Sequence, residues 1–336
     1  MPQVRRSACA ALAIAIWAGC EGKLAHEPFS EPVVIEVPRG ATSQEIAGAL
    51  QSRGVISSKW AFLWERAWNR DATLQAGEYL FERPLNASEV IDILESGSVR
   101  LYPLTIREGL NRFDTAEVVA STGLATREEF LALTADPTMV KDIFPQAETL
   151  EGCLFPDTYQ LAKTSTVQDL IGAMVASFRR ALDRARSQRS IAIVNWDSLI
   201  LASMIEKETG DKGERALVSS VFHNRMQRGM LMQCDPTIIY GLLLEGRFRG
   251  RIYLSDITDP HIYNTYVHEG LPPGPIANPG LESLKAAFCP SRSDYLFFVA
   301  APGPRTGHTF SATLRDHNKA VRDLRLYQQA NRSSAR

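Results

Sequence analysis

One acidic residue stands out in this 336-residue chain because it ends an apolar helix face. The sequence predicts a helix over residues 198–209, in which Leu201, Met204 and Ile205 share one face with Glu208. Burial at the end of that face disfavours the ionised carboxylate, and the negative end of the helix dipole acts in the same direction. Both effects raise the pKa of Glu208, which is what a general acid at neutral pH needs.

The same residue has a simpler interpretation that the sequence leaves open. A glutamate in the last turn of a helix can pair with a nearby lysine or arginine and have no catalytic role. Glu206, two residues earlier, is expected on the opposite face of the helix and in solvent. Glu208 is therefore the preferred candidate acid of the two.

Polar and aromatic residues that suit a sugar ligand follow this helix. Amide, hydroxyl and carboxylate side chains bind sugar hydroxyls and acetamides, and tyrosines stack on sugar rings. The candidate substrate-binding residues are Glu214, Asn224, Arg225, Gln233, Asp235, Tyr263, Asn264, Thr265 and Tyr266. The sequence contains no GxxxxGK[ST] phosphate loop, no GxSxG elbow and no HExxH motif. We therefore expect no metal, no organic cofactor and no serine nucleophile. His308 and His317 stand alone and are expected to be ordinary loop or surface histidines.

The charge balance and the N-terminus limit where the protein works. Lysines and arginines number 37 against 38 acidic residues, so a nucleic-acid partner is not expected. Arg5 and Arg6 precede an apolar run over 8–18, which is typical of an export signal and shorter than the roughly 20 residues of a membrane span. The run ends at Cys20 after small residues, as in a lipobox. Cys20 is thus either lipidated or part of a short uncleaved anchor, and the remaining chain lies outside the cytoplasm.

The other cysteines do not form a recognisable framework. If Cys20 is lipidated, the body of the chain keeps Cys153, Cys234 and Cys289, and an odd number cannot be fully paired. None lies in a CxxC or Cys/His cluster, so a zinc site is not expected. We expect small buried hydrophobic residues, with a single disulfide among them left open because export would permit it.

The chain divides by pattern into a tether over 21–31, a small β–α subdomain over 32–100 and a larger mixed α+β domain over 101–330. In the subdomain, Thr42 and Glu45 form a capping-box pattern that predicts the start of a helix. A second helix, after Ser57, carries Trp60, Trp64 and Trp68 on one face. Such a stripe is usually the core of a small domain, and a platform that stacks on sugars is the alternative.

In the larger domain, the pattern predicts mostly helices over 126–190, then a helix capped by Asp197 or Ser198 and another over 212–228. Residues 229–280 are rich in proline and glycine and are expected to form long loops. A strand over 295–300 is expected to pair with 308–311, and a helix over 314–328 closes the chain.

At these residues the chain resembles the YceG-like family of endolytic murein transglycosylases, from about residue 33 to residue 328. The resemblance is carried by the segments 201–209 (LASMIEKET), 221–225 (VFHNR), 233–241 (QCDPTIIYG), 263–266 (YNTY), 270–274 (GLPPG), 278–280 (NPG) and 308–310 (HTF). The resemblance implies that Glu208, the second glutamate of Glu-Lys-Glu-Thr, is the catalytic acid. It also implies a LysM-like subdomain over 32–100 and a catalytic domain over 101–330. Cys234 and Cys153 depart from the family pattern, which has a threonine and an aromatic residue there, and the family anchor is usually a transmembrane helix.

The resemblance further implies a reaction and a location. Glu208 would protonate the oxygen between MurNAc and GlcNAc within a glycan strand and then accept the proton of the C6 hydroxyl, leaving 1,6-anhydro-MurNAc ends without a cofactor. The expected partners are peptidoglycan strands and the membrane, with peptidoglycan synthases as further candidates. The expected location is the inner membrane, with the catalytic domain facing the periplasm. A peptidoglycan-binding protein without catalysis and a lysozyme-type hydrolase are the alternatives. A pyridoxal-phosphate lyase is not expected because no phosphate cradle is present.

Overall fold

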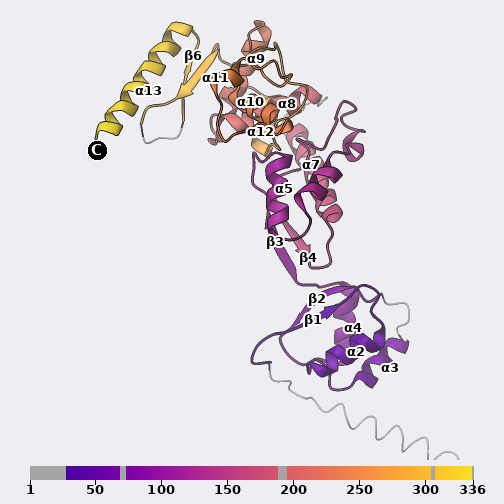
Figure 1. Cartoon of the computed structure of the whole chain (residues 1–336). Helices are drawn as coiled ribbons and strands as arrows, with labels where there is room; N and C mark the ends of the chain where they lie inside the picture. The colour runs from indigo at the N-terminus through magenta and orange to yellow at the C-terminus, as the bar shows by residue number, and fades with distance from the viewer. Residues whose placement is uncertain (1–27, 69–72, 188–194, 304–306, 335–336) are drawn as a thin grey trace, which may run out of the picture. The chain divides into compact units, whose positions relative to one another are not determined.

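The computed structural model describes residues 28–68, 73–187, 195–303 and 307–334 (Figure 1). It has the mixed α+β composition that the sequence predicts, with small two-stranded sheets among many helices. The chain forms two compact units. One contains the described residues up to Tyr102 together with Gln160–Thr164, and the other contains Pro103–Tyr159 and the residues from Ser165 onward. The predicted export segment and Cys20 lie outside the described residues.

The first unit packs three helices on a two-stranded sheet. Its elements are β1 (Val33–Val37), α2 (Ser43–Ser52), α3 (Lys59–Trp68), β2 (Gly77–Phe81) and α4 (Ala87–Ser96). β1 pairs antiparallel with β2, with Val33 opposite Phe81. The predicted capping box at Thr42 is confirmed, because its side chain accepts from the N–H of Glu45 while Glu45 accepts in return. Ile35, Leu50, Phe62, Tyr79 and Leu94 belong to the buried core of this unit.

The tryptophan stripe of α3 is not part of that core, so the prediction was wrong. Trp60, Trp64 and Trp68 are 70%, 57% and 72% exposed. The helix buries Phe62 instead. Helical spacing correctly placed the three indoles on one face, but it could not tell which face turns inward, because Phe62 and the partly buried Leu63 supply a second apolar side.

The second unit begins with a helical layer. Its first elements are β3 (Leu101–Thr105), α5 (Arg112–Ser121), α6 (Arg127–Thr134), the 3-10 turn η1 (Thr138–Val140), β4 (Thr158–Ala162) and α7 (Val167–Ser187). β3 and β4 form a two-stranded sheet, and both strands carry the chain from one unit to the other. α7 is amphipathic and buries ten residues, among them Met174 and Phe178.

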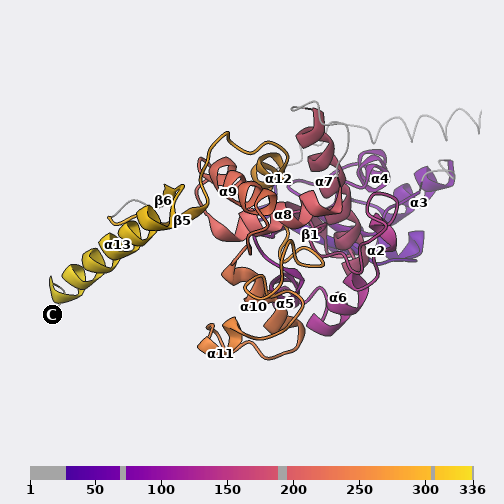
Figure 2. The same cartoon turned by 90° about the horizontal axis from the view of Figure 1, so that it is seen from above.

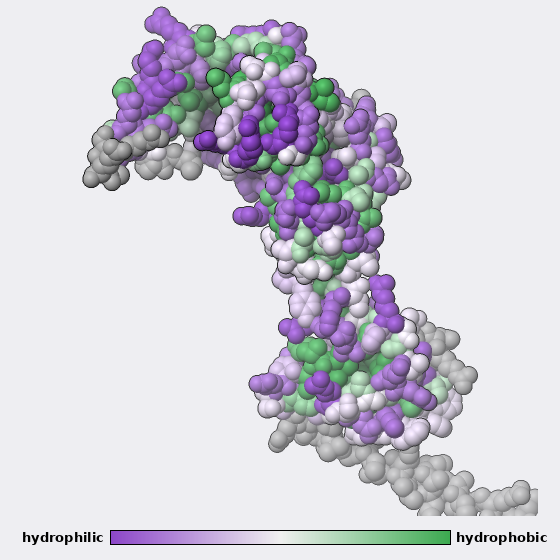
Figure 3. Space-filling view, viewed as in Figure 1, coloured by the Kyte–Doolittle hydropathy of each residue, from purple (hydrophilic) through white to green (hydrophobic). Residues whose placement is uncertain are grey.

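The remaining elements surround one central helix. They are α8 (Trp196–Glu208), α9 (Arg215–Gln227), α10 (Asp235–Leu244), α11 (Leu254–Ile257), α12 (Leu281–Phe288), β5 (Phe297–Ala300), β6 (His308–Ser311) and α13 (Leu314–Ser334). α8 contacts α9, α10 and α12 (Figure 2), and its residues 199–206 are all buried. The predicted antiparallel pairing of β5 with β6 is confirmed. Hydrophilic side chains cover much of α13 on the face in Figure 3. In the described parts of the chain, no helix is both long and apolar enough to cross a membrane.

Three predicted boundaries differ from the structure. α8 is capped by Asn195, whose side chain accepts from the N–H of Ser198, so the cap lies earlier than Asp197. α9 begins at Arg215, because the segment before it forms a turn. α10 occupies part of the predicted loop region. Its start at Asp235-Pro236 belongs to the proline-rich stretch that predicts loops, but proline is also well suited to the first turn of a helix.

Candidate active site

Glu208 is the last residue of α8 and is half-buried. Burial raises the pKa of its carboxyl, and the nearby charge of Asp235 raises it further. A hydrogen bond with the Cys234 thiol and the positive charges of His308 and Arg225 act in the opposite direction. Since burial outweighs them, the net shift is upward, as the sequence predicts. The structure thus gathers one carboxyl with a raised pKa among groups from three other segments.

The loop before α10 places Cys234 and Asp235 beside this carboxyl. Cys234 is fully buried, and its N–H donates to Oγ1 of Thr265 at 3.0 Å. Gln233 has a φ of 52°, which non-glycine residues seldom adopt, and it donates its N–H to the carbonyl of Thr265 at 3.1 Å. This strained backbone is held by Thr265, which lies 31 positions from Cys234 and 32 from Gln233, and this fixes where α10 begins at Asp235.

Tyr266 interacts with both acidic residues of the site, Asp235 and Glu208. Its hydroxyl donates to Oδ1 of Asp235 at 2.5 Å. Burial, the hydrogen bond to Asp235 and the charge of Glu208 all raise the pKa of Tyr266, so the phenol stays protonated. Tyr266 therefore orients Asp235 and remains a hydrogen-bond donor beside Glu208.

Arg225 supplies positive charge, but its shortest hydrogen bonds go to backbone carbonyls. Nε donates to the carbonyl of Leu296 at 2.7 Å, and Nη1 donates to the carbonyl of Met232 at 2.8 Å. Burial lowers the pKa of Arg225. The guanidinium therefore ties the loop before Cys234 to the chain leading into β5, while its charge still acts on Glu208.

His308 is a site residue that the sequence did not single out. It lies on β6, and its N–H donates to Oε1 of Glu214 at 2.8 Å while its Nδ1 lies 2.8 Å from Oε2. Glu214 directly precedes α9, so these two bonds tie the ring of His308 on β6 to the start of α9. The charge of His308 acts on Glu208. Only the family motif His-Thr-Phe marked this position in the sequence.

Three predicted substrate-binding residues instead hold loops. The amide of Asn224 donates to the carbonyls of Ser293 and Tyr295, both at 2.9 Å. The buried amide of Asn264 donates to three backbone carbonyls, the shortest bond being 2.7 Å to Asp259. Thr265 bonds to the N–H of Cys234 and to Thr237. These residues shape the site without presenting donors to a ligand.

Tyr263 is not gathered with Glu208 either. Its ring packs on Tyr240, with the ring centroids 5.1 Å apart. Burial raises its pKa to about 12, and the acidic residues that act on it are Glu151 and Glu148. Tyr263 therefore belongs to a neighbouring buried cluster.

That cluster surrounds a second carboxyl with a raised pKa, which the sequence did not predict. Glu151 is 2% exposed, and burial raises its pKa to about 7. Its oxygens accept from the N–H of Arg112 at 2.9 Å, the hydroxyl of Tyr240 at 3.0 Å and the amide of Asn278 at 3.2 Å. Both carboxylate oxygens are engaged inside the unit, so Glu151 holds these buried segments together.

Glu206 is buried, so the prediction that it is solvated was wrong. Its Oε1 accepts from Arg215 at 2.8 Å, and its Oε2 accepts from the N–H of Gly280 at 2.9 Å. Arg215 also donates to Glu108 at 3.1 Å. The physical reason is that Arg215 and the backbone of Gly280, just before α12, pair with this carboxylate and cover it. The two glutamates of Glu-Lys-Glu therefore have different surroundings, one in a buried ion pair and one at the open helix end.

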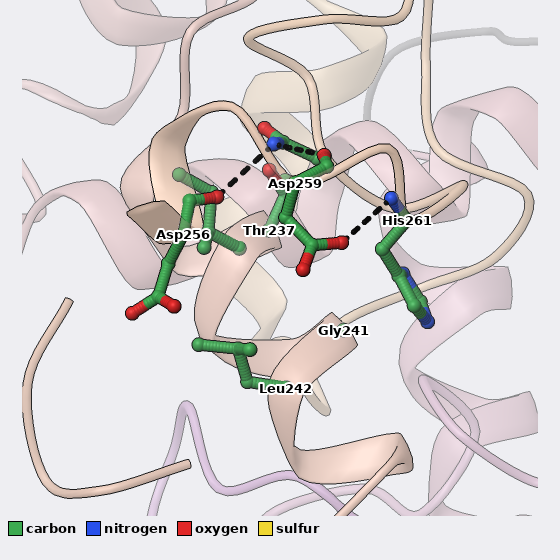
Figure 4. A pocket seen from close by; sticks show the side chains of 8 residues that line it. Thr237, Gly241, Leu242, Asp256, Asp259 and His261 are labelled. Carbon is green, nitrogen blue, oxygen red and sulfur yellow. Dashed lines mark hydrogen bonds between the residues drawn. The ribbon is translucent and has the colours of Figure 1, made fainter. Parts of the chain in front are cut away.

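A small cavity of the unit lies elsewhere (Figure 4). It is lined by residues that include Thr237, Gly241, Asp256, Asp259 and His261, and its volume is about 10 Å³. That is room for about one water molecule, so it cannot hold a sugar ring. Among the described residues, no group of three His, Cys, Asp or Glu side chains could hold a metal ion. Cys153 and Cys234 are buried free thiols, and Cys289 is a partly buried one.

Comparisons with known proteins agree with the motifs. The model of the YceG-like family matches residues 35–323. An "Endolytic murein transglycosylase" of Bacillus subtilis (strain 168) is 32% identical over 320 residues, covering 89% of this chain and 88% of that protein. A protein of the same name from Streptococcus pneumoniae (strain D39 / NCTC 7466) is 28% identical over 300 residues. The match covers 80% of this chain and 54% of the pneumococcal one, so this chain spans about half of it.

A solved structure is similar as well. The crystal structure of a putative YceG-like protein from Listeria monocytogenes is 31% identical to this chain, with a TM-score of 0.56. The likeness covers 86% of this chain and 99% of the other. The extent of the family match and the similarity to the Bacillus protein lead to one conclusion: this chain belongs to the YceG-like family.

Proposed function

We propose that this protein is a lytic transglycosylase that cleaves within the glycan strands of peptidoglycan, with Glu208 as its acid and base. The observation that carries the proposal is the raised pKa of a single half-buried carboxyl at the open end of α8. A carboxyl that stays protonated near neutral pH can donate a proton to a leaving-group oxygen. The names of the Bacillus and pneumococcal relatives support the same reaction class.

The reaction proceeds in two proton transfers on one carboxyl. Protonated Glu208 donates to the oxygen between MurNAc and GlcNAc, and the bond from that oxygen to C1 of MurNAc breaks. The carboxylate then takes the proton of the C6 hydroxyl as its oxygen bonds to C1, which closes the 1,6-anhydro ring. Water is not consumed, and Glu208 ends protonated as it began.

The neighbours of Glu208 have complementary roles in this scheme. The negative charge of Asp235 raises the pKa of Glu208 and would stabilise the positive charge that develops at C1. Tyr266 holds Asp235 in place through its short hydrogen bond. His308, fixed by Glu214, counters that effect and limits how far the pKa of Glu208 rises.

A lysozyme-type hydrolase is the second candidate, and Asp235 is the observation that favours it. Most glycosidases use two carboxylates, one as acid and one as base or nucleophile. Asp235 lies near enough to Glu208 to act on its pKa, so the site holds such a pair. In that reaction water takes the place of the C6 hydroxyl.

The end groups of the products separate the two reactions. Purified protein is incubated with peptidoglycan strands, and the released fragments are analysed by mass spectrometry. The proposal expects 1,6-anhydro-MurNAc ends, which are lighter by one water than reducing ends. Reducing MurNAc ends would instead establish the hydrolase, and absence of fragments would leave a binding protein.

The location and the small unit belong to the same proposal. The N-terminal segment would hold the protein in the inner membrane, with the catalytic unit in the periplasm and a LysM-like first unit near the membrane. Peptidoglycan synthases are the candidate protein partners. Metabolic labelling with a fatty acid tests the anchor, because a lipidated Cys20 predicts label on the wild type and none on Cys20→Ala. An unlabelled wild type that remains with membranes would indicate an uncleaved anchor.

A further inference from the structure

The exposed face of α3 is apolar along its whole length. At 3.6 residues per turn, Trp60, Ala61, Trp64, Ala67 and Trp68 fall within an arc of about 120°. All five are exposed, whereas Phe62 points to the opposite side and is fully buried. Amphipathic helices of soluble domains normally turn the apolar face inward. On α3 the larger apolar face is turned outward.

The three indoles lie outside the core of the first unit. None of them belongs to the buried cluster of this unit or to the half-buried residues packed against it. Trp64 and Trp68 contact each other edge to face, with ring centroids 6.0 Å apart, and Lys59 lies 5.3 Å from the ring of Trp60. From Trp60 to Trp68 the ridge is about 12 Å long. A continuous exposed ridge of this kind indicates a surface that something else covers.

The chemistry of the ridge favours a lipid surface over a sugar. Its five exposed residues carry no hydroxyl, amide or carboxyl group, so it offers little to the hydroxyls of a glycan. Tryptophan prefers the boundary between lipid headgroups and acyl chains, where its ring is in apolar surroundings and its N–H meets water. Lys59 and Arg66 on the same helix outnumber Glu65, which suits an anionic headgroup layer.

The position of the helix along the chain brings a bilayer within reach. The apolar run over 8–18 and Cys20 precede the first unit, and Phe29, nine residues beyond Cys20, is already bonded to the unit through the carbonyl of Glu82. Nine residues span at most about 30 Å when fully extended. With the N-terminal segment in a membrane, the first unit cannot move far from its surface.

We propose that the outward face of α3 docks on the phospholipid surface of the membrane that anchors the chain, with Trp60, Trp64 and Trp68 inserted at the headgroup boundary. The docking gives the protein a second, reversible membrane contact and restricts the orientations that the first unit can adopt. It rests on the proposed N-terminal anchoring and does not depend on which glycan reaction the second unit performs.

The test uses the full chain reconstituted into vesicles of phosphatidylethanolamine and phosphatidylglycerol, with and without brominated lipids that quench tryptophan fluorescence. We expect the brominated lipids to quench the wild type more strongly than Trp60→Ser/Trp64→Ser/Trp68→Ser. Trp196, together with Trp17 where the N-terminal segment is not cleaved, is the same in both proteins and supplies the baseline. Leu254→Ser, which removes an 82% exposed side chain from the second unit, should quench like the wild type.

Each other outcome overturns the proposal. Equal quenching of the wild type and the triple variant would place the indoles in water. Loss of binding to peptidoglycan sacculi in the triple variant, without any lipid quenching of the wild type, would identify a glycan platform. A wild type that does not stay with the vesicles would show that the chain is not anchored to a bilayer, and the proposal would fail. Glycan cleavage measured on the same preparations reports separately on the proposed function.

Discussion

α3 and α8 were each expected to bury one apolar stripe, but only α8 does so in the structure. α3 lies at the edge of a small unit and leaves its tryptophans in solvent. α8 lies among α9, α10 and α12 and is buried on nearly every side, so that even Glu206 has no access to water. Helical periodicity reports which residues share a face. Whether that face or its opposite is covered depends on neighbours that come from distant parts of the sequence.

The sharpest test of the comparison concerns the C-terminal end of α8, where Glu208 lies. Glu208→Gln should reduce strand cleavage by roughly 10²–10⁴-fold, because the amide cannot supply a proton. The melting temperature should stay close to that of the wild type, since the side chain is nearly isosteric. Fragment release is measured by chromatography of digested peptidoglycan. Substantial activity in this variant would exclude Glu208 as the acid.

A substitution in the buried part of α8 should lower the free energy of unfolding. Glu206→Gln removes one charge from a pair whose side chains are 4% and 3% exposed, leaving Arg215 with Glu108 alone. Breaking a buried pair in this way costs about 3–5 kcal/mol of unfolding free energy. Denaturant titration of the variant measures the cost, and Glu128→Gln, which changes a 79% exposed carboxylate, is the matched control. A stability loss no larger than that of the control would contradict the buried pairing.

The surroundings of Glu208 predict opposite shifts in the pH dependence of kcat/KM. A general acid loses activity as the pH rises through its pKa, so the falling limb of the profile reports the pKa of Glu208. Asp235 raises that pKa and His308 lowers it. Asp235→Asn should therefore move the limb to lower pH, and His308→Asn should move it to higher pH. Shifts in the same direction, or none, would show that the limb belongs to another group.

The smallest effect is expected at the outer face of α3. Trp64→Ala should change the unfolding free energy little, because the side chain is 57% exposed. Phe62→Ala, two residues away on the buried side, should cost about 3–5 kcal/mol. Thermal unfolding of the two variants side by side measures the difference. If Trp64→Ala were the more destabilising change, the tryptophan face of α3, and not the face of Phe62, would be the buried one.

Local signals in the sequence were sufficient for much of the fold. The capping box at Thr42, the pairing of β5 with β6 and the upward shift of the Glu208 pKa depend on residues close in sequence or on one helix face, and the structure agrees with each. Element boundaries were predicted less well where one residue type favours two structures, as with the proline at the start of α10, which suits both a loop and a first helical turn.

The rest of the site depends on contacts that are distant in sequence. Glu214 and His308 are 94 residues apart, and Tyr266 reaches Asp235 across 31 residues. No spacing rule brings such pairs together. Asn224 and Asn264 have the right chemistry for a sugar, but their amides are taken by backbone carbonyls. Residue type alone could not distinguish a side chain that contacts a ligand from one that holds a loop.

The hydrogen bond between Cys234 and Glu208 has a practical consequence. Burial and the adjacent carboxyl raise the pKa of the Cys234 thiol well above its usual range, so almost none of the reactive thiolate forms in the closed protein. We therefore expect alkylating reagents to reach this sulfur only when the loop before α10 moves away from it, and to label the partly buried Cys289 faster. The ratio of the two labelling rates measures how often the site opens, which makes Cys234 a native chemical reporter of site dynamics.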